Sequence, residues 1–207
     1  MINKRGFTLA EVLVALVIIG VIAAMVVPII LMQTNRNAYR SSFRKEYSVL
    51  SSALNKLTSD NNGSIKDMAN TSVDFRDMFS KYLNTMKVCD QGYSGGCRYA
   101  GATGQNGQSD GGFSWMQDTP AVVLADGTIL QFYLSAADCS DAVHGCGIIT
   151  IDVNGVKRPN REGEDVYLIH VFHNAIKPFG YDGDGYASDC DTPSSMGWTC
   201  AAVRLRD

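Results

Sequence analysis

Residues 152–165 carry a dense run of oxygen-bearing groups. A D-x-N-G pattern opens the run at a strand-like end, and carboxylates close it before the next apolar stretch. Calcium takes about six to eight hard oxygen ligands, which a turn-rich segment supplies from side chains and carbonyls together. The pattern predicts a calcium site, although Gly163 at the twelfth position excludes an EF-hand. The alternative is a turn whose side chains cap their own backbone. The candidate ligands are Asp152, Asn154, Val156, Glu164 and Asp165.

A second acidic group lies near the C-terminus, at Asp182, Asp184, Asp189 and Asp191. Its spacing also suits calcium, but no glutamate completes the set. We favour the alternative, a solvated loop tethered by a disulfide.

Six cysteines all lie beyond residue 88, and none lies in the apolar N-terminal segment. An even number of cysteines in an exported domain indicates disulfides. The sequence leaves all the possible pairings open, and we predict the three between sequence neighbours: Cys89–Cys97, Cys139–Cys146 and Cys190–Cys200. A zinc site is the rival interpretation, but it would use C-x-x-C pairs, and none is present.

The histidines do not form an evident metal site, and the known catalytic motifs are absent from the sequence. His170 and His173 are an odd number of positions apart in a strand-like run, so their rings point to opposite faces. The sequence contains no H-E-x-x-H, P-loop, G-x-S-x-G or dinucleotide motif. We therefore predict that the chain is not an enzyme.

The N-terminal segment is the strongest feature of the chain. Lys4 and Arg5 precede a run from Val12 to Met32 that is apolar apart from small breaks at Gly20 and Pro28. A bilayer span needs about 20 apolar residues. The run is longer than the apolar part of a secretory signal peptide. A simple membrane anchor would explain its length but not Glu11, because an unpaired carboxylate at membrane depth costs about 2–3 kcal/mol.

The stretch Gly6-Phe7-Thr8-Leu9-Ala10-Glu11, with the apolar run that follows, resembles the prepilin motif of type IV pilins and type II secretion pseudopilins. The resemblance implies that a prepilin peptidase cuts between Gly6 and Phe7 and methylates the new amine of Phe7. It also implies that Glu11 pairs with that amine on a neighbouring subunit. Pro28 matches the family too, where a proline bends or locally melts the helix. Residues 152–165 are similar to segments of pilin-like heads. Some pseudopilins bind calcium in a comparable loop, which this sequence does not match residue by residue.

Charge sets the expected location and partners. Residues 60–207 hold 19 acidic and 11 basic residues, so we expect no general nucleic-acid binding. Arg36, Arg40, Arg44 and Lys45 follow the span, and the positive-inside rule alone would favour the opposite orientation. The cleavage motif requires a cytoplasmic N-terminus, so we expect a single-pass inner-membrane protein with a periplasmic or extracellular head. Arg36, Arg40 and Arg44 lie four positions apart and would form one stripe along a helix. We interpret this arginine stripe as a solvated face, a contact to neighbouring acidic heads, or a lipid contact.

The sequence predicts three parts: a leader at 1–6, a long helix at 7–59 whose part 12–32 lies in the membrane or filament core, and a head at 60–207. A second helix is expected over 74–86, and strands over 121–125, 128–133, 147–153, 166–172 and 199–205. The fold class is therefore α+β, with a long N-terminal helix packed on an antiparallel sheet, as in pilins.

The combined prediction is a structural subunit of a type IV pilus-like filament. Its expected partners are the prepilin peptidase, like or related subunits, an inner-membrane assembly platform, and lipid before assembly. The alternatives are a type II secretion pseudopilin, a minor tip pilin for adhesion or DNA uptake, and, from a different class, a membrane-tethered binding domain or enzyme. Beyond possible Ca²⁺, no cofactor is expected.

Overall fold

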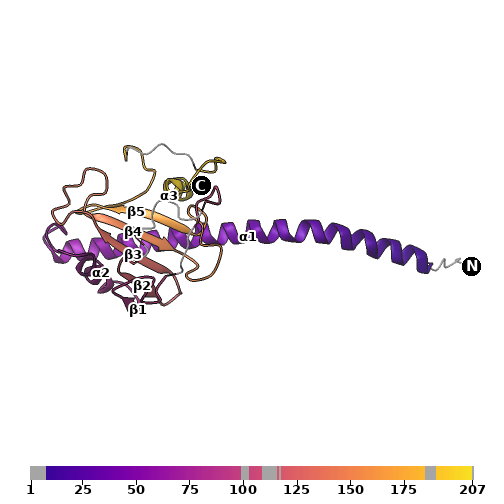
Figure 1. Ribbon diagram of the computed structural model, residues 1–207, viewed down its shortest axis with the longest axis horizontal. Coiled ribbons are helices and arrows are strands. Elements are labelled where there is room, and N and C mark those ends of the chain that lie inside the picture. The colour runs from indigo at the N-terminus through magenta and orange to yellow at the C-terminus, as the bar shows by residue number, and fades with distance from the viewer. Residues whose placement is uncertain (1–7, 99–102, 109–115, 117, 185–189, 207) are drawn as a thin grey trace, which may run out of the picture. The chain divides into compact units, whose positions relative to one another are not determined.

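The computed structural model describes residues 8–98, 103–108, 116, 118–184 and 190–206 (Figure 1). The chain divides into two compact units, Met1–Ala38 and Tyr39–Asp207. Helix α1 (Leu9–Asp60) supplies residues 9–38 of the first unit and 39–60 of the second.

The first unit is a helix with an apolar surface. Every described residue from 8 to 38 is exposed, including Ile19 at 63 % and Met25 at 67 %. Pro28 lies within the helix, where it lacks the N–H that would bond to the carbonyl four residues earlier. In the part of the chain that the structure describes, α1 is the one helix long and apolar enough to cross a membrane.

The second unit begins with the amphipathic half of α1. Phe43, Leu50, Leu54 and Leu57 lie on one helical face and are buried. The Phe43 ring stacks on the ring of Tyr167 at a centroid distance of 4.1 Å, which joins the helix to one face of the sheet. The predicted α+β class, with the helix packed on an antiparallel sheet, is confirmed. Figure 1 shows this half of α1 running behind the strands.

The sheet has six antiparallel strands in the order β1-β2-β3-β4-β5-β6, so every strand pairs with its neighbours in the chain. The strands are β1 (Thr85–Cys89), β2 (Ala121–Leu124), β3 (Ile129–Leu134), β4 (Gly147–Asp152), β5 (Val166–Val171) and β6 (Ile176–Pro178). A turn that contains Asp126 and Gly127 joins β2 to β3, and Gly127 adopts φ +92°, a positive value that glycine tolerates best.

Both faces of the central strands are covered. All six residues of β4 and all six of β5 are buried. Tyr167 faces α1, whereas its neighbours Val166 and Leu168 point to the opposite face and are equally buried. This double burial, which is unusual for an antiparallel sheet, also encloses the polar side chains of Thr150, Asp152 and His170.

Two predicted elements differ from the structure. The second helix, α2 (Ser72–Ser80), ends six residues before Met86, and residues 85–89 form β1 instead. A capping box of Thr71 and Asp74 starts α2. Tyr82, Leu83 and Met86 continued the helical spacing by coincidence, while Thr85 and Val88 supply the β-branched side chains that favour a strand.

The C-terminal segment was predicted as a strand and is helix α3 (Cys200–Arg206). Ala201, Ala202 and Leu205 are strong helix formers, and their propensity outweighs the short apolar run. Figure 1 shows α3 beside β5.

Candidate functional site

The first candidate site is the start of α1. Gly6 and Phe7, the predicted cleavage and methylation residues, lie outside the described residues. Thr8 is the residue before the helix, and its carbonyl accepts the first helical hydrogen bond from Val12 N at 3.3 Å. Glu11 Oε2 accepts hydrogen bonds from the Thr8 backbone N–H and from the Thr8 hydroxyl, both at 2.8 Å.

The contact is reciprocal, because the Thr8 hydroxyl oxygen accepts a bond from the Glu11 N–H at 3.3 Å. This arrangement is a capping box, which satisfies backbone donors that the first turn of a helix leaves without partners. The motif resemblance implies a role for Glu11 but none for Thr8. The T-x-x-E spacing was the signal that could have identified it.

Beyond Glu11, the exposed apolar side chains of residues 12–32 provide a surface for lipid or for other helices. Pro28 lies within this stretch of α1. Glu11 and Pro28, the two assembly residues that the structure describes, both lie on α1.

The arginine stripe has a partial explanation inside the second unit. The Arg44 side chain donates from Nε to the carbonyl of Arg204 in α3, at 3.1 Å. A cation near the last carbonyls of a helix is favourable, because those groups lack helical partners. The solvated face and the neighbour contact remain predictions for the rest of the stripe.

The second candidate site is the β4–β5 loop, which is organised around Asp165. This carboxylate is fully buried and accepts from the backbone N–H of Asn160 at 2.8 Å and of Arg161 at 2.5 Å. Burial raises the pKa of Asp165, although these hydrogen bonds oppose the shift. The structural alternative, a turn that caps its own backbone, is therefore present in this loop.

Asp152 lies close to Asp165. Burial raises the pKa of Asp152 well above its ordinary value, and the charge of Asp165 raises it further. A cavity of about 10 Å³ is lined by Asp152 and Asn160 together with Arg98, Gln131 and Thr150. This is room for about one water molecule.

Two asparagines in this loop are under-satisfied. Among the residues that the structure describes, Asn154 Oδ1 and both side-chain polar atoms of Asn160 are buried without a hydrogen-bond partner. A buried polar atom without a protein partner is rare, and it has the capacity to bind a water molecule or an ion. Sequence reasoning did not select Asn160. Its position in the acidic loop, after a proline, was the only signal.

The remaining predicted ligands, Glu164 and Val156, do not join the buried carboxylates and asparagines. Glu164 Oε2 is 3.4 Å from Arg161 Nη1, and the Val156 side chain is exposed. Across the described ranges, no group of three or more His, Cys, Asp or Glu residues is arranged to hold a metal. Any cation in this loop would therefore need asparagine and carbonyl oxygens as well as Asp152 and Asp165.

The second acidic group is divided among other partners. Asp191 accepts from both terminal nitrogens of Arg204, at 2.8 and 2.5 Å. Asp184 accepts from the Gly180 N–H at 2.5 Å, and Asp182 is exposed. Asp189 lies outside the described residues.

Three disulfides are present, and the prediction that the cysteines form disulfides is confirmed. The bonds are Cys89–Cys97, Cys139–Cys146 and Cys190–Cys200, each between neighbouring cysteines in the sequence.

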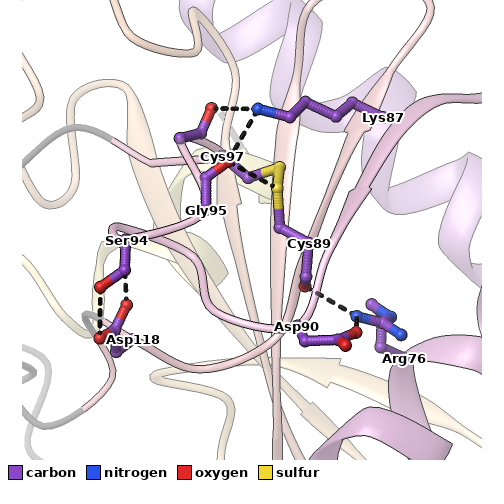
Figure 2. Close-up of a disulfide and its surroundings, with 9 residues drawn as sticks. Arg76, Lys87, Cys89, Asp90, Ser94, Gly95, Cys97 and Asp118 are labelled. Carbon is purple, nitrogen blue, oxygen red and sulfur yellow. Dashed lines mark hydrogen bonds and ion pairs between the residues drawn. A yellow bond between two sulfur atoms is a disulfide. The ribbon is translucent and has the colours of Figure 1, made fainter.

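The loop closed by Cys89–Cys97 is also held from α2 and β1 (Figure 2). The buried Arg76 donates to the Cys89 carbonyl at 2.7 Å and to Asp90 at 2.6 Å. Lys87 donates to the Gly95 carbonyl at 2.8 Å.

The far side of the same loop is tied to Asp118. This carboxylate accepts from the Ser94 N–H at 3.0 Å and from its hydroxyl at 2.9 Å (Figure 2). The loop is thus fixed at both sides, with the Tyr93 side chain 51 % exposed.

The N-terminal segment matches a known family. Residues 1–27 match the family model described as the prokaryotic N-terminal methylation motif. No curated protein and no solved structure matches the chain. The match covers the leader, the capping box and the apolar part of α1 as far as Val27. This motif together with one long apolar helix fits a membrane-anchored pilin. The N-terminal segment of this chain is therefore a prokaryotic N-terminal methylation motif, the prepilin-cleavage signature of type IV pilins and pseudopilins.

Proposed function

We propose that the chain is a structural subunit of a type IV pilus-like filament and has no catalytic activity of its own. In this proposal a prepilin peptidase cuts between Gly6 and Phe7 on the cytoplasmic side and methylates the amine of Phe7. The observation that carries the proposal is the methylation motif at residues 1–27, followed by a helix whose side chains are all exposed up to residue 38.

The physical driving force for assembly comes from packing and charge. Lipid tails are as apolar as leucine side chains, so helices gain little hydrophobic free energy by leaving lipid for a bundle. Close packing and a polar pair must supply the preference. A carboxylate–amine pair in an apolar core strongly disfavours arrangements that leave either charge alone, so Glu11 would set the register of neighbouring subunits.

The head would lie in the periplasm or outside the cell, with the N-terminus cytoplasmic before assembly. Three disulfides support this placement, because such bonds persist in oxidising compartments. The partners would be the peptidase, an inner-membrane assembly platform, and like or related subunits. The same motif serves pseudopilins of type II secretion systems, which are the runner-up.

The test is mass spectrometry of the protein purified from membranes of its own host. The expected N-terminus is N-methylated Phe7. A Gly6→Val variant should keep its leader and stay out of filaments, while Gly20→Val, far from the cut, should be processed normally. Recovery of the native chain with its leader intact, or cut beyond Met32, would refute the proposal. Surface filaments carrying the head favour a pilus, and filaments confined to the periplasm favour a pseudopilin.

For the β4–β5 loop we propose Ca²⁺ binding through the carboxylates of Asp152 and Asp165 with the Asn154 and Asn160 side-chain oxygens. The supporting observation is the set of buried asparagine atoms without partners beside two buried acids. The hard oxygen donors fit calcium, which would supply positive charge beside both carboxylates. Of these four residues, Asp152 and Asn160 line the small cavity that Arg98 also lines, and the Arg98 charge would compete with calcium for Asp152.

Calcium binding is tested by thermal unfolding of the full chain in detergent. Adding a chelator should lower the Tm by several degrees, and excess calcium should restore it. Asn160→Asp and Asp152→Asn should change the response to calcium, whereas Asp182→Asn, on an exposed residue outside this loop, should not. An unchanged Tm in chelator would eliminate the calcium proposal and leave the loop as a self-capping turn.

A further inference from the structure

His170 is a fully buried histidine on strand β5. Tyr167, which stacks on Phe43 of α1, lies an odd number of positions away, so His170 points to the opposite face of the sheet. Its side chain is 0 % exposed, and among the residues that the structure describes neither ring nitrogen has a hydrogen-bond partner. A neutral imidazole carries one N–H donor, so this ring already keeps one polar group unsatisfied.

Aromatic rings surround this imidazole. Phe179 stacks on it with 4.0 Å between the ring centroids and 11° between the planes, and Tyr181 meets it edge-on at 5.7 Å. The Phe172 ring lies 6.3 Å away. An aromatic face attracts a cation, but it provides no oxygen for an N–H group. Protonation would therefore place two N–H donors and a full charge in surroundings that satisfy neither donor.

Charged groups from the neighbouring elements oppose one another around His170. His144, from the β3–β4 connection, has its ring centroid 5.4 Å away, and Lys177 of β6 is the register partner of His170. A charge on either disfavours a charge on His170, whereas the Asp141 carboxylate favours it. Asp141 is already engaged, because it accepts from the Ser135 hydroxyl at 2.5 Å and lies 3.0 Å from His144 Nδ1.

Asp184 and helix α3 complete the surroundings. Asp184 Oδ2 lies 3.8 Å from His170 Nε2, which exceeds hydrogen-bond distance. The same oxygen accepts from the Gly180 N–H at 2.5 Å. Helix α3 also packs against β5, and its buried Arg204 is paired with Asp191.

Burial determines the protonation state of His170. It lowers the pKa of the ring from 6.5 to about 3, and the charges of His144 and Lys177 act in the same direction against Asp141. When the ring reaches water, its pKa returns toward 6.5. The closed form is therefore fully favoured above about pH 6.5, and it loses stability relative to a form with His170 exposed as the pH falls toward 3.

The segment that covers His170 lies at the edge of the sheet. β6 has three residues and is the last strand in the sheet order. Phe179 extends this edge, since its N–H donates to the Leu168 carbonyl and its carbonyl accepts from the Ala202 N–H, both at 3.0 Å. Such a short edge segment can separate while the central strands stay paired.

We propose that residues 176–184 form an acid-sensitive latch: in mildly acidic solution His170 takes up a proton as this segment separates from β5, and the rings of Phe179 and Tyr181 become exposed. A proton reaches the ring only when the cover opens, so acid draws the equilibrium toward the open form. Each group in this argument belongs to the second unit. The inference therefore goes beyond the proposed filament and does not depend on it.

The test is amide exchange of the full-length chain in detergent micelles at pH 7.5 and 4.5, with each rate corrected for intrinsic exchange at that pH. The protection of the Phe179 amide should fall about 100-fold, because one proton shifts the opening equilibrium up to about tenfold per pH unit below the open-state pKa. The amides of β4, at the sheet centre, should keep their protection. His170→Phe suits the aromatic surroundings and takes no proton, so it should abolish the fall. His173→Gln, the matched control, should leave the fall unchanged.

The outcomes separate the latch from its alternatives. Unchanged protection of Phe179 at pH 4.5, an equal fall in β4, or an acid response that persists in His170→Phe overturns the proposal. If His170→Phe does not fold, the ring shifts of His170 in the wild type decide. A ring that titrates above pH 4.5 while the Phe179 amide stays protected would show that Asp184 stabilises the charged ring, and the latch would be wrong. Titration that accompanies the loss of Phe179 protection supports it.

Discussion

Glu46 carries a buried carboxyl group on the side of α1 that faces the β2–β3 turn. Its side chain is 1 % exposed, and Oε1 lies 3.0 Å from Lys45 Nζ, which also pairs with Asp126. Burial raises the pKa of Glu46, partly opposed by the hydrogen bond from Lys45. Burial also tends to raise the pKa of Asp126, but the bond from Lys45 and other bonds lower it to about 2. Two neighbouring acids thus shift in opposite directions.

The sign of each shift fixes its pH window. The contribution of Glu46 to stability is present below its unfolded pKa and is lost as pH rises through its raised folded value. We predict that Glu46→Gln raises the Tm at pH 7 by about 2–4 °C, on the order of 1 kcal/mol, and leaves it nearly unchanged near pH 4. Thermal unfolding at both pH values checks this. An equal change at both would show that the charge of Glu46 is irrelevant.

Asp126 behaves in the opposite sense. Its contribution is present above the unfolded pKa and is lost as pH falls toward 2. Asp126→Asn should therefore destabilise the head modestly at pH 7, by about 1 kcal/mol or less because both partners are partly exposed. The loss should vanish near pH 2. A loss of equal size at pH 2 would attribute the effect to the turn rather than to the charge.

The role of a single residue was predictable where a charged side chain lies in an apolar stretch of sequence. Glu11 was visible because a carboxylate within an apolar run needs a partner. Thr8 and Asn160 were not, because each depends on a contact that only the folded backbone creates. The second acidic group shows a predicted calcium ligand that has another partner. Asp191 is paired with Arg204, which lies beyond the loop.

At the scale of elements, the Cys89–Cys97 bond closes a loop of eight-residue separation. Constraint of the unfolded chain by a loop of this length is worth about 2.5 kcal/mol. We predict that replacing both cysteines by serine lowers the Tm by about 5–10 °C while the folded loop persists through Arg76, Lys87 and Asp118. Calorimetry and the amide shifts of residues 90–96 check the two parts. Collapse of those shifts would show that the charged contacts cannot hold the loop alone.

Helix α3 gives a second prediction at this scale. Arg204 is buried and makes a bidentate pair with Asp191, which is more exposed. Arg204→Met keeps much of the buried stem and leaves the Asp191 charge close to water. We expect a loss of about 1–2 kcal/mol, with faster amide exchange confined to α3. Lys157→Met, an exposed substitution, is the control. Uniform loosening of the sheet would contradict a local role.

Element types were predictable where the pattern was long or the turn distinctive. The Asp126-Gly127 pair indicated a hairpin, and the β-rich runs 147–153 and 166–172 indicated strands β4 and β5. The segment 82–89 and the C-terminal seven residues were too short for periodicity to decide, so capping and propensity determined the result. The covering of the second sheet face was also beyond the sequence, because it depends on where long loops return.

For the whole molecule, the division at residues 38 and 39 has a direct test. We predict that a chain beginning at Tyr39 folds without detergent and unfolds cooperatively, because the buried residues of α1 all lie at Phe43 or beyond. Its Tm should lie within a few degrees of that of the full chain in detergent. A non-cooperative transition with lost near-ultraviolet dichroism would show that residues 9–38 contribute to the core of the head.

The strand order has a consequence for the proposed export of the head. Each strand of the head pairs with the strand that precedes it in the chain, from β1 to β6. A chain that crosses a membrane from its N-terminal side releases these strands in the same order. Every newly emerged strand therefore finds its partner already outside, and no early strand must wait for a distant one. Such a head can assemble progressively during translocation, and its longest connection, residues 90–120 between β1 and β2, is the first to close.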